Sequence, residues 1–431
     1  MKYFLYAFSL AFLACQNGSD EDSNPAKNAT NKLRYVHYNI KELDSQKLRD
    51  ETEQALSAAQ ILSELAPDFV SINEIQYDMK DVPTIAFKSE GKNLDKLLRL
   101  SGIGEDWDQN FYPANTGARA QKDENGDFSA NRGNMGLVDS VNFGFFPGQY
   151  STGFASRFSI ESKLNINMLT WKDWDPSVDL SEYDIGGVSE TTYELFDKSF
   201  NVSKVKIGGH LVQFVTFHTV PAYRFGNSKS PNIERNKAQL EFLSWYLIGE
   251  CDSRSESIVK SCRTKIRPLS KGERFIVAGD LNVDLSSENP GAFVLKSLLA
   301  DSRVHDRVSL IADGNLLLEE QFPAEGTYFR SGIDYSNQVM QLDYFIVSSN
   351  IKIDRLETHL PVAQLEKPAC FEDYSEAFEL VSSRSLEKNG NEYEVFERYN
   401  PKEHCVLGAS PEYMRLRKAS DHLPLILEFS L

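Results

Sequence analysis

The stretch Phe275-Ile276-Val277-Ala278-Gly279-Asp280-Leu281-Asn282 decides the predicted fold. Its apolar run resembles a buried strand, and strand alternation points the side chains of Asp280 and Asn282 the same way. Near the C-terminus, Ser420-Asp421-His422 places an acid and an imidazole directly before a second apolar run at residues 423–429. Both stretches are typical of strand ends that carry catalytic side chains.

Five other strand-like runs have polar residues beside them in the same way. These residues are Asn39, Glu74, Arg157, His218 and Asp343. Carboxylate and amide oxygens are the ligands that a hard cation such as Mg²⁺ prefers. The sequence shows no Cys/His pair with zinc-ligand spacing, so it does not indicate a soft transition metal. The pattern predicts a hard-cation site with two histidines and an arginine beside it.

A series of polar residues in a fixed order resembles the endonuclease/exonuclease/phosphatase superfamily. The resemblance extends from about residue 33 to the end of the chain, and its members are Asn39, Glu74, Ser156-Arg157, His218, Asp280/Asn282, Asp343 and Asp421/His422. A narrower resemblance, to secreted bacterial members, rests on His218-Thr219-Val220-Pro221 and Glu234-Arg235-Asn236, followed by a helix-like run at residues 237–248. The family's fold implies an α/β (α+β) protein, a four-layer αββα sandwich of two mixed or antiparallel sheets flanked by helices.

The resemblance also implies a metal-dependent phosphoester hydrolase and assigns the residues their roles. Asn39, Glu74 and Asp421 would hold Mg²⁺, with Mn²⁺ as the alternative ion. Asp280 would orient or deprotonate the attacking water, and Asn282 would donate to a phosphate oxygen. The sequence leaves open whether Asp280 or His422 activates the water.

Three further residues complete the implied site. Asp343 would pair with His422 and fix its tautomer, and His218 would donate to the phosphate as a charged ring. Arg157 would be either a second phosphate contact or a structural residue behind the ligands. Each residue alone has an ordinary structural explanation, such as a cap or a surface ion pair. Their joint order favours the site.

Periodicity predicts the elements between these residues. Apolar residues at helical spacing predict a helix over residues 46–65, ended by Ala66-Pro67, and a shorter helix over Asn93–Leu100. Strand-like runs follow at residues 142–146, 164–171, 200–207 and 211–217. This mixture favours two packed sheets flanked by helices.

The N-terminus resembles a leader for export. Met1-Lys2 precedes an apolar run at residues 3–14 that is too short to span a bilayer, and Leu13-Ala14-Cys15 resembles the end of a lipoprotein signal, although Phe12 stands where Leu is usual. Residues 1–15 are therefore predicted to be a leader and residues 16–32 a disordered tether. The catalytic domain would cover residues 33–431, with a stapled insertion at about 350–418 near the rim of the active site. We expect a monomer that is membrane-anchored if Cys15 is lipidated, and otherwise periplasmic or extracellular.

The cysteines apart from Cys15 form an even set, which suits an exported chain. Because each pair closes a local polar segment, we predict the disulfides Cys251–Cys262 and Cys370–Cys405. The alternative is four buried free thiols.

The formal net charge of −17 restricts the substrate. Nucleic acids gain affinity by releasing counterions to Lys and Arg, so an acidic chain of this kind is disfavoured as a nucleic-acid binder. The charge favours a phosphomonoesterase or phosphodiesterase that acts on small or lipid head-group substrates. A secreted nuclease and a sphingomyelinase-like phospholipase C are alternatives within the fold. A non-catalytic surface binding lipoprotein is the alternative from another class.

Overall fold

The computed structural model describes most of the chain after residue 31. The described residues are 32–82, 92–128, 135–251, 256, 258, 262, 266–305, 328–329, 339–359, 369–373, 375, 392–399, 402–409 and 411–431. Contacts divide the chain into two units, Met1–Asn31 and Lys32–Leu431. The predicted leader, the lipidation of Cys15 and most of the tether lie outside the described residues and stay predictions.

The first of two large sheets has six strands in the order β12-β16-β1-β2-β4-β3. At its centre β1 pairs parallel with β2 and antiparallel with β16. Its strands are β1 (Leu33–Leu43), β2 (Phe69–Ile75), β3 (Asp108–Tyr112), β4 (Ser151–Ser156), β12 (Lys352–Thr358) and β16 (Leu425–Ser430). The single parallel pair places the carboxyl ends of β1 and β2 at the same edge.

The second large sheet has five strands in the order β11-β8-β7-β6-β5. Its one parallel pair is β7 with β8, and the other neighbours are antiparallel. The strands are β5 (Ile160–Ile166), β6 (Phe200–Ile207), β7 (His210–His218), β8 (Arg274–Asp280) and β11 (Asp343–Val347). The apolar run that opened the sequence analysis is therefore an interior strand, β8.

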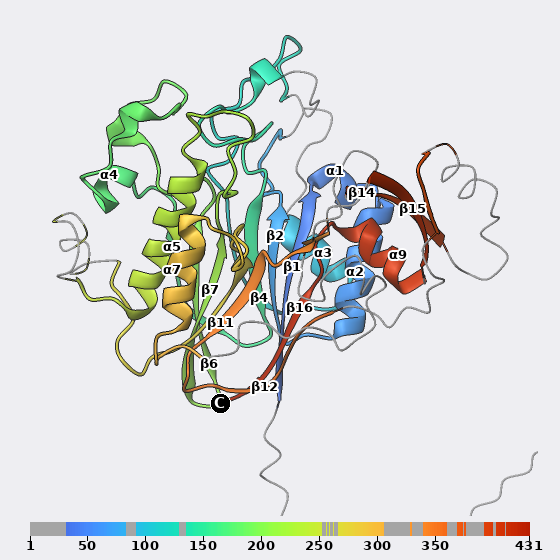
Figure 1. Cartoon of the computed structure of the whole chain (residues 1–431). Coiled ribbons are helices and arrows are strands. Elements are labelled where there is room, and N and C mark those ends of the chain that lie inside the picture. The colour runs from blue at the N-terminus through green and yellow to red at the C-terminus, as the bar shows by residue number, and fades with distance from the viewer. Residues whose placement is uncertain are drawn as a thin grey trace, which may run out of the picture. The chain divides into compact units, whose positions relative to one another are not determined.

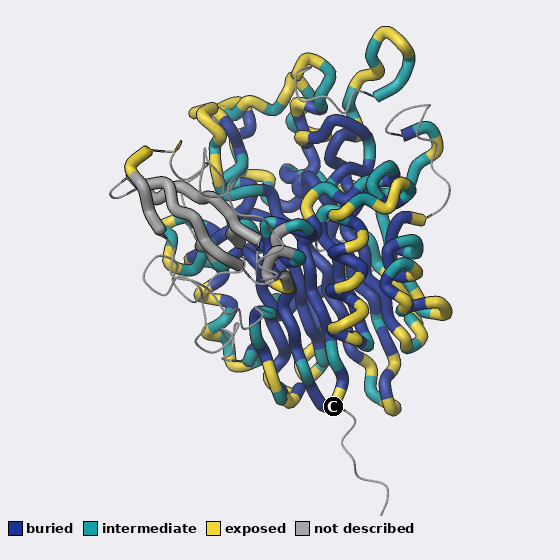
Figure 2. The backbone as a smooth tube through the Cα atoms, turned by 90° about the vertical axis from the view of Figure 1, so that its right-hand side faces the viewer, coloured by how far each residue is buried: buried dark blue, intermediate teal, exposed yellow. Residues whose placement is uncertain are grey.

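The two sheets pack face to face over a buried aromatic and aliphatic core. Tyr35, Phe69, Phe214 and Phe345 are fully buried there, and the ring centroids of Phe69 and Phe214 lie 4.6 Å apart. Burying a side chain of this size contributes about 1.5–3 kcal/mol. Figure 2 shows the strands as mostly buried tube, with exposed residues gathered at turns and outer segments.

Helices α1 (Ser45–Arg49), α2 (Glu53–Leu65), α3 (Asn93–Leu100) and α9 (Pro411–Ala419) cover the six-stranded sheet. Leu62 and neighbouring apolar residues of α2 form the face that packs on the strands. The helix predicted over residues 46–65 is two helices, because Glu51 has a φ of 47° between them and breaks the helical path. The predicted helix Asn93–Leu100 is confirmed.

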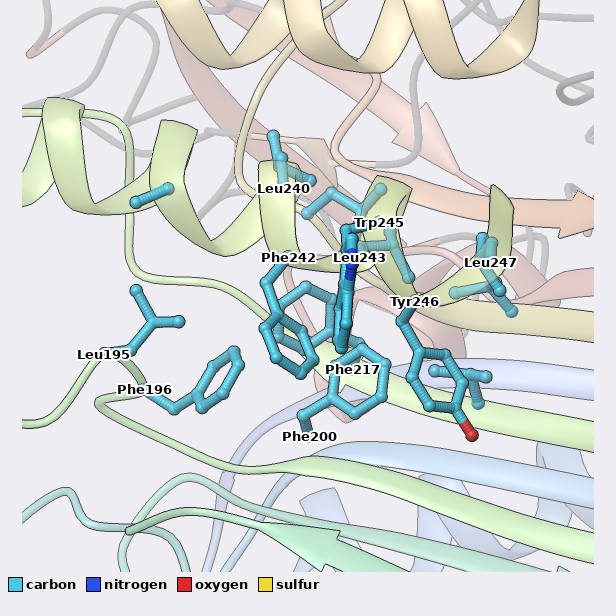
Figure 3. Close-up of a cluster of buried hydrophobic side chains, with 14 of the residues drawn as sticks. Leu195, Phe196, Phe200, Phe217, Leu240, Phe242, Leu243, Trp245, Tyr246 and Leu247 are labelled. Atoms are coloured by element: carbon cyan, nitrogen blue, oxygen red, sulfur yellow. The ribbon is translucent and has the colours of Figure 1, made fainter. Parts of the chain in front are cut away.

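Helices α5 (Asn232–Ile248) and α7 (Pro290–Leu299) cover the five-stranded sheet, and the short α4 (Trp171–Trp174) packs beside them (Figure 1). Figure 3 shows Phe242, Trp245 and Tyr246 of α5 directed onto Phe200 and Phe217 of the strands. The ring centroids of Phe200 and Phe217 lie 5.1 Å apart. With one helical layer on each sheet, the predicted four-layer αββα sandwich is confirmed.

The remaining elements lie outside the two large sheets and the helices that cover them. They are the 3₁₀ helices η2 (Met135–Leu137), η3 (Leu180–Glu182) and η4 (Glu190–Thr192), the pair β9 (Tyr328–Phe329) and β10 (Val339–Met340), and a three-stranded sheet of β13 (Ala369–Phe371), β14 (Glu392–Tyr399) and β15 (Lys402–Ala409). In the segment predicted as an insertion, residues 350–418, β12 belongs to the six-stranded sheet and α9 packs on α2. The part of this segment that is separate from the main sheets can therefore begin only after Thr358, and the insertion is shorter than predicted.

The structure contains the disulfide Cys251–Cys262, which confirms that prediction. Cys370 and Cys405 are register partners in the β13/β15 ladder. Their side chains lie outside the described residues, so the second disulfide stays a prediction. Among the described residues, no helix combines the length and the apolar character needed to cross a membrane.

Two predicted strands are wrong. Residues 142–146 form a loop, because the side chain of Asp139 accepts hydrogen bonds from the backbone N–H groups of Val141 and Asn142 and turns the chain there. The run 164–171 is divided, since β5 ends at Ile166 and α4 begins at Trp171. The strands predicted at residues 200–207 and 211–217 are confirmed as β6 and β7.

Candidate active site

Six strand ends from the two sheets meet at one place. Asn39 and Glu74 lie at the carboxyl ends of β1 and β2, and His218 and Asp280 at those of β7 and β8. Asp343 begins β11, and Asp421-His422 precede β16. Hydrogen bonds connect the sheets at this edge, including one of 3.0 Å from Asn39 Nδ2 to Asp280 Oδ2. The structure brings eight of the nine predicted site residues together.

Asp280 is the carboxylate on which donors from both sheets converge. Its Oδ2 lies 3.0 Å from Asn39 Nδ2, 3.4 Å from His218 Nε2 and 3.9 Å from His422 Nε2. Its backbone N–H donates to Asn73 Oδ1 of β2 at 2.9 Å, which fixes the main chain as well. Asp280 is 2% exposed. A carboxylate held this firmly can accept a proton or orient a water without moving first.

Asp343 lies between two histidines. Its Oδ2 is 2.7 Å from His422 Nδ1, and its Oδ1 is 3.1 Å from His37 Nε2. Burial alone would raise the pKa of Asp343, but His422 and then His37 lower it below the ordinary range. Burial would lower the pKa of His422, yet the neighbouring Asp343 raises it to about 10. The His422 ring is therefore charged at neutral pH.

Glu74, Asn39 and Asp421 form the acidic side of the site. Glu74 has a φ of 62°, a strained conformation for a residue with a side chain, and it accepts hydrogen bonds from Asn39 Nδ2 at 3.2 Å and from the backbone N–H of Glu42 at 3.1 Å. Burial and the charge of Asp421 raise the pKa of Glu74 to about 7. The pKa of a carboxylate rises where neighbouring negative charge disfavours its ionisation, and a bound cation would neutralise that charge.

The donor set therefore fits a divalent cation. Glu74, His218 and Asp280 offer ligand atoms within 4.8 Å of one another, and Asp280, Asp343 and His422 form a second such group. The predicted ligands Asn39, Glu74 and Asp421 are all oxygen donors, which suits Mg²⁺ or Mn²⁺. Asp421 Oδ2 lies 2.9 Å from Lys41 Nζ, so the lysine ammonium is its partner in this structure.

His218 differs from its predicted state. Burial and then the charge of Lys198 lower the pKa of His218 to about 4, which favours a neutral ring at pH 7 where the sequence predicted a charged one. His218 Nε2 lies 3.4 Å from Asp280 Oδ2, which is farther than the 3.0 Å between Asn39 Nδ2 and the same oxygen. Its buried Nδ1 contacts no hydrogen-bond partner among the described residues. His218 can still donate one hydrogen bond.

Asn282 is placed by a turn, and strand alternation does not position it as the sequence analysis assumed. β8 ends at Asp280, and Asn282 has a φ of 51°, the left-handed region that Asn tolerates. Its backbone N–H donates to Asp280 Oδ1 at 2.8 Å, and its Nδ2 donates to the Thr219 carbonyl at 3.0 Å. The amide is thereby held beside His218.

Arg157 lies away from the site, so its assignment as a phosphate contact is wrong. It follows β4, which is antiparallel to β2, so it lies at the edge where β2 begins and Glu74 lies at the other. Its Nε is 2.9 Å from Asp68 Oδ1, and its guanidinium covers the ring of Phe158 at 4.9 Å. Arg157 is thus a structural residue, but it lies at the opposite edge of the sheet and not behind the proposed ligands.

A cavity of about 670 Å³ opens beside these strand ends. Glu74, His218 and Asn282 line it, while Asn39, Asp280 and His422 do not. Its outer wall includes the apolar side chains of Phe143 and Phe225, which are 49% and 67% exposed. A substrate bound there would meet the polar strand ends on one side and apolar surface on the other.

Sequence reasoning missed several residues that hold the site. His37 was expected to share the face of Asn39 on β1, but it was not assigned to the site because a core histidine explained the two-residue spacing equally well. Asn73 supports the Asp280 main chain, and Tyr150 Oη donates to Glu42 Oε1 at 2.7 Å. Lys198, beside His218, had no sequence signal, because its position depends on packing between distant segments.

Residues 261–422 match the Endonuclease/Exonuclease/phosphatase family. Over these residues, the resemblance predicted from the sequence is confirmed. No curated protein matches the chain.

Solved structures similar to this chain include family proteins and a bacterial toxin. An endonuclease/exonuclease/phosphatase from Beutenbergia cavernae is 15% identical, with a TM-score of 0.48 over 93% of this chain and 72% of that one. The mannosyl-6-phosphatase Bt3783 of Bacteroides thetaiotaomicron is 14% identical, with a TM-score of 0.42 over 93% and 100%. A Staphylococcus aureus beta toxin variant with bound magnesium ions is 14% identical, with a TM-score of 0.41 over 93% and 100%.

Proposed function

Since residues 261–422 match the Endonuclease/Exonuclease/phosphatase family, we propose that this protein is a Mg²⁺-dependent phosphoester hydrolase that acts outside the cytoplasm. The observation that carries the proposal is the convergence on Asp280 Oδ2 of donors from both sheets, Asn39 at 3.0 Å, His218 at 3.4 Å and His422 at 3.9 Å. Buried polar groups from distant parts of a chain meet in this way at catalytic sites.

Asn39, Glu74 and Asp421 would hold the cation, with Mg²⁺ preferred and Mn²⁺ as the alternative. When bound, the ion would offset the negative charge that develops on the phosphoryl group. The Glu74 carboxylate, whose pKa lies near 7 in this structure, would then stay ionised at neutral pH. Asp421 would exchange its ammonium partner Lys41 for the ion.

Asp280 would act on the attacking water and His422 on the phosphoryl oxygens. The short contact between His422 Nδ1 and Asp343 holds the histidine ring as the imidazolium, so its Nε2 can donate but cannot accept a proton. Asp280 is the acceptor at the same place. This arrangement favours Asp280 over His422 as the group that activates water.

The reaction would be an in-line displacement at phosphorus. The water oxygen forms a bond to phosphorus, the bond from phosphorus to the ester oxygen breaks, and its electron pair leaves with that oxygen. The proton that water loses to Asp280 ends on the leaving alcohol. Asn282 Nδ2 and His218 would donate to the phosphoryl oxygens that stay.

The Cys251–Cys262 disulfide supports a location in an oxidising compartment. We propose export through the predicted leader, with an anchor at Cys15 if that residue is lipidated, and a monomeric enzyme. The net charge of −17 favours small or lipid head-group esters over nucleic acid.

An assay of the purified chain tests the proposal. We expect p-nitrophenyl phosphate, bis-p-nitrophenyl phosphate or both to be hydrolysed in Mg²⁺ and not in EDTA. Plasmid DNA and sphingomyelin complete the panel, and faster turnover of either would point to a nuclease or to a sphingomyelinase-like phospholipase C. If none of the four substrates shows metal-dependent turnover, the hydrolase proposal fails and a non-catalytic binding lipoprotein is favoured.

A further inference from the structure

A buried lysine beside the candidate site has no role in the proposed mechanism. Lys198 is 5% exposed and lines the cavity together with His218 and Asn282. It precedes β6, and Phe196, two residues earlier, is fixed in the aromatic cluster under α5 (Figure 3). Packing therefore holds the ammonium group in place at the cavity wall.

The geometry ties Lys198 to the donors proposed for the phosphoryl oxygens. Lys198 Nζ donates to the Thr219 carbonyl oxygen at 3.2 Å, and Asn282 Nδ2 donates to the same oxygen at 3.0 Å. His218 is the residue before Thr219. One peptide carbonyl thus holds the ammonium of Lys198 and the amide of Asn282 as neighbours.

The ammonium also has hydrogen-bonding capacity left. Its acceptors among the described residues are Asp197 Oδ2 at 2.8 Å and the Thr219 carbonyl, whereas an ammonium carries three N–H groups. A buried ion pair contributes little net stability compared with apolar packing, so stability alone is a weak reason for charge at this position. A third N–H at the cavity wall is suited to an anionic oxygen.

The arginines that line the cavity have other partners. Arg235 donates to the carbonyls of Leu195 and Glu194, to Tyr193 Oη and to Asn142 Oδ1. Arg224 donates to the Ser228 carbonyl and to Glu234 Oε1 at 2.8 Å. Neither is hydrogen-bonded to Thr219, so among the described lining residues Lys198 is the cation that a hydrogen bond connects to the catalytic strand ends.

We propose that Lys198 binds the phosphoryl group of the substrate and makes the site select phosphate monoesters, which are dianions, over diesters, which are monoanions. The inference rests on the proposed phosphoester hydrolysis and names its substrate class. A monoester has a second ionisation near pH 6, so it carries close to two negative charges at neutral pH. The additional charge gains most from a buried cation, because the low dielectric of the cavity wall strengthens the attraction.

The test uses a double variant that avoids an unpaired buried charge. Asp197→Asn/Lys198→Met removes both charges, and Asp197→Asn removes only the carboxylate. Lys237→Met on α5 is the control, because Lys237 is partly exposed and pairs with Glu241 outside the cavity. For each, kcat/KM is measured on p-nitrophenyl phosphate and bis-p-nitrophenyl phosphate in Mg²⁺. Binding of inorganic phosphate is measured by calorimetry with Mg²⁺ and again with EDTA.

We expect the double variant to lose about 10- to 100-fold in kcat/KM on the monoester and in phosphate affinity, the size of a charged hydrogen bond. Its diester activity should change less than about 3-fold, Asp197→Asn should keep or tighten phosphate binding, and Lys237→Met should match the wild type. The inference would be overturned if the double variant lost equally on both esters or kept its phosphate affinity. It would also be overturned if Asp197→Asn alone lost as much as the double variant. If the wild type hydrolyses none of the four substrates named above, the proposed function fails, while phosphate calorimetry still decides the role of Lys198.

Discussion

The two large sheets have the same pairing pattern and contribute to the site from equivalent positions. In each, an antiparallel strand, a parallel pair and two further antiparallel strands follow one another, as β16-β1-β2-β4-β3 and as β11-β8-β7-β6-β5. The equivalent positions hold Asn39 and Asp280, Glu74 and His218, and His422 and Asp343.

The side chains at these equivalent positions differ in chemistry. Glu74 and Asp421, from the six-stranded sheet, are partly exposed oxygen donors, and the pKa of Glu74 is raised to about 7. Asp280 and Asp343, from the five-stranded sheet, are buried and hydrogen-bonded to side chains of the other sheet. We therefore propose that the two sheets have different roles: the six-stranded sheet binds the cation, and the five-stranded sheet supplies the proton acceptor.

The largest expected effect comes from removing that acceptor. Asp280→Asn keeps the shape but loses the basic carboxylate, so kcat should fall by about 10³-fold or more in a p-nitrophenyl ester assay. Mg²⁺ affinity measured by calorimetry should change far less. Asp301→Asn, which removes a partly exposed carboxylate beyond α7, is the control. If Asp280→Asn lost as much Mg²⁺ affinity as kcat, the proposed difference in role between the two sheets would be contradicted.

The converse change is made in the six-stranded sheet. Glu74→Gln should weaken Mg²⁺ binding by about 10- to 100-fold, because a neutral amide replaces a charged ligand. Excess Mg²⁺ should then restore much of the activity, which it should not do for Asp280→Asn. Glu161→Gln on β5 is the control, since that side chain is exposed and pairs with Lys206 away from the site. Unchanged Mg²⁺ affinity in Glu74→Gln would remove this residue from the cation site.

A smaller effect is expected at the junction of the sheets. His37→Gln removes the ring that contacts Asp343 Oδ1 at 3.1 Å, so Asp343 should hold His422 less firmly and kcat should fall by about 10-fold. Because Asp343 would lose one of the groups that lower its pKa, the acidic limb of the pH–rate profile should move to higher pH. A structural role alone would lower kcat without moving that limb. His210→Gln, at the opposite end of β7, is the control.

The smallest effect concerns stability in acid. Burial would raise the pKa of Asp197, but Lys198 and Arg235 lower it from 3.8 to about 2. A carboxylate whose pKa is lower in the folded than in the unfolded protein stabilises the fold at pH values above the unfolded pKa. This stabilisation disappears as the pH falls from about 4 to about 2. Asp197→Asn should therefore lose about 2 kcal/mol of unfolding free energy at pH 7 and have a shallower decline below pH 4 than the wild type. Chemical denaturation at several pH values measures both slopes, and parallel declines would contradict the assignment.

The sequence was sufficient for residues whose signal is local. Asp280 and His422 border apolar runs, so their positions at strand ends could be predicted without a structure. Arg157 also borders such a run, but the sequence does not say at which edge of the sheet a strand ends, and the antiparallel direction of β4 places Arg157 at the other edge. Lys198 and Asn73 were missed because their contacts join segments far apart in the chain. The lowered pKa of His218 has no sequence signal either, because it depends on burial and on the nearby lysine.

Asp343 connects one strand of the five-stranded sheet to two histidines carried by the other sheet. If the sheets slid past each other by a single residue, both of its hydrogen bonds would break at once, and every side chain at the junction would change its neighbour. Partly opened molecules should therefore be inactive even where each sheet keeps its own ladder. The activity that remains during heating or denaturation would then be proportional to the fraction of molecules in which the two sheets are still packed in the native register.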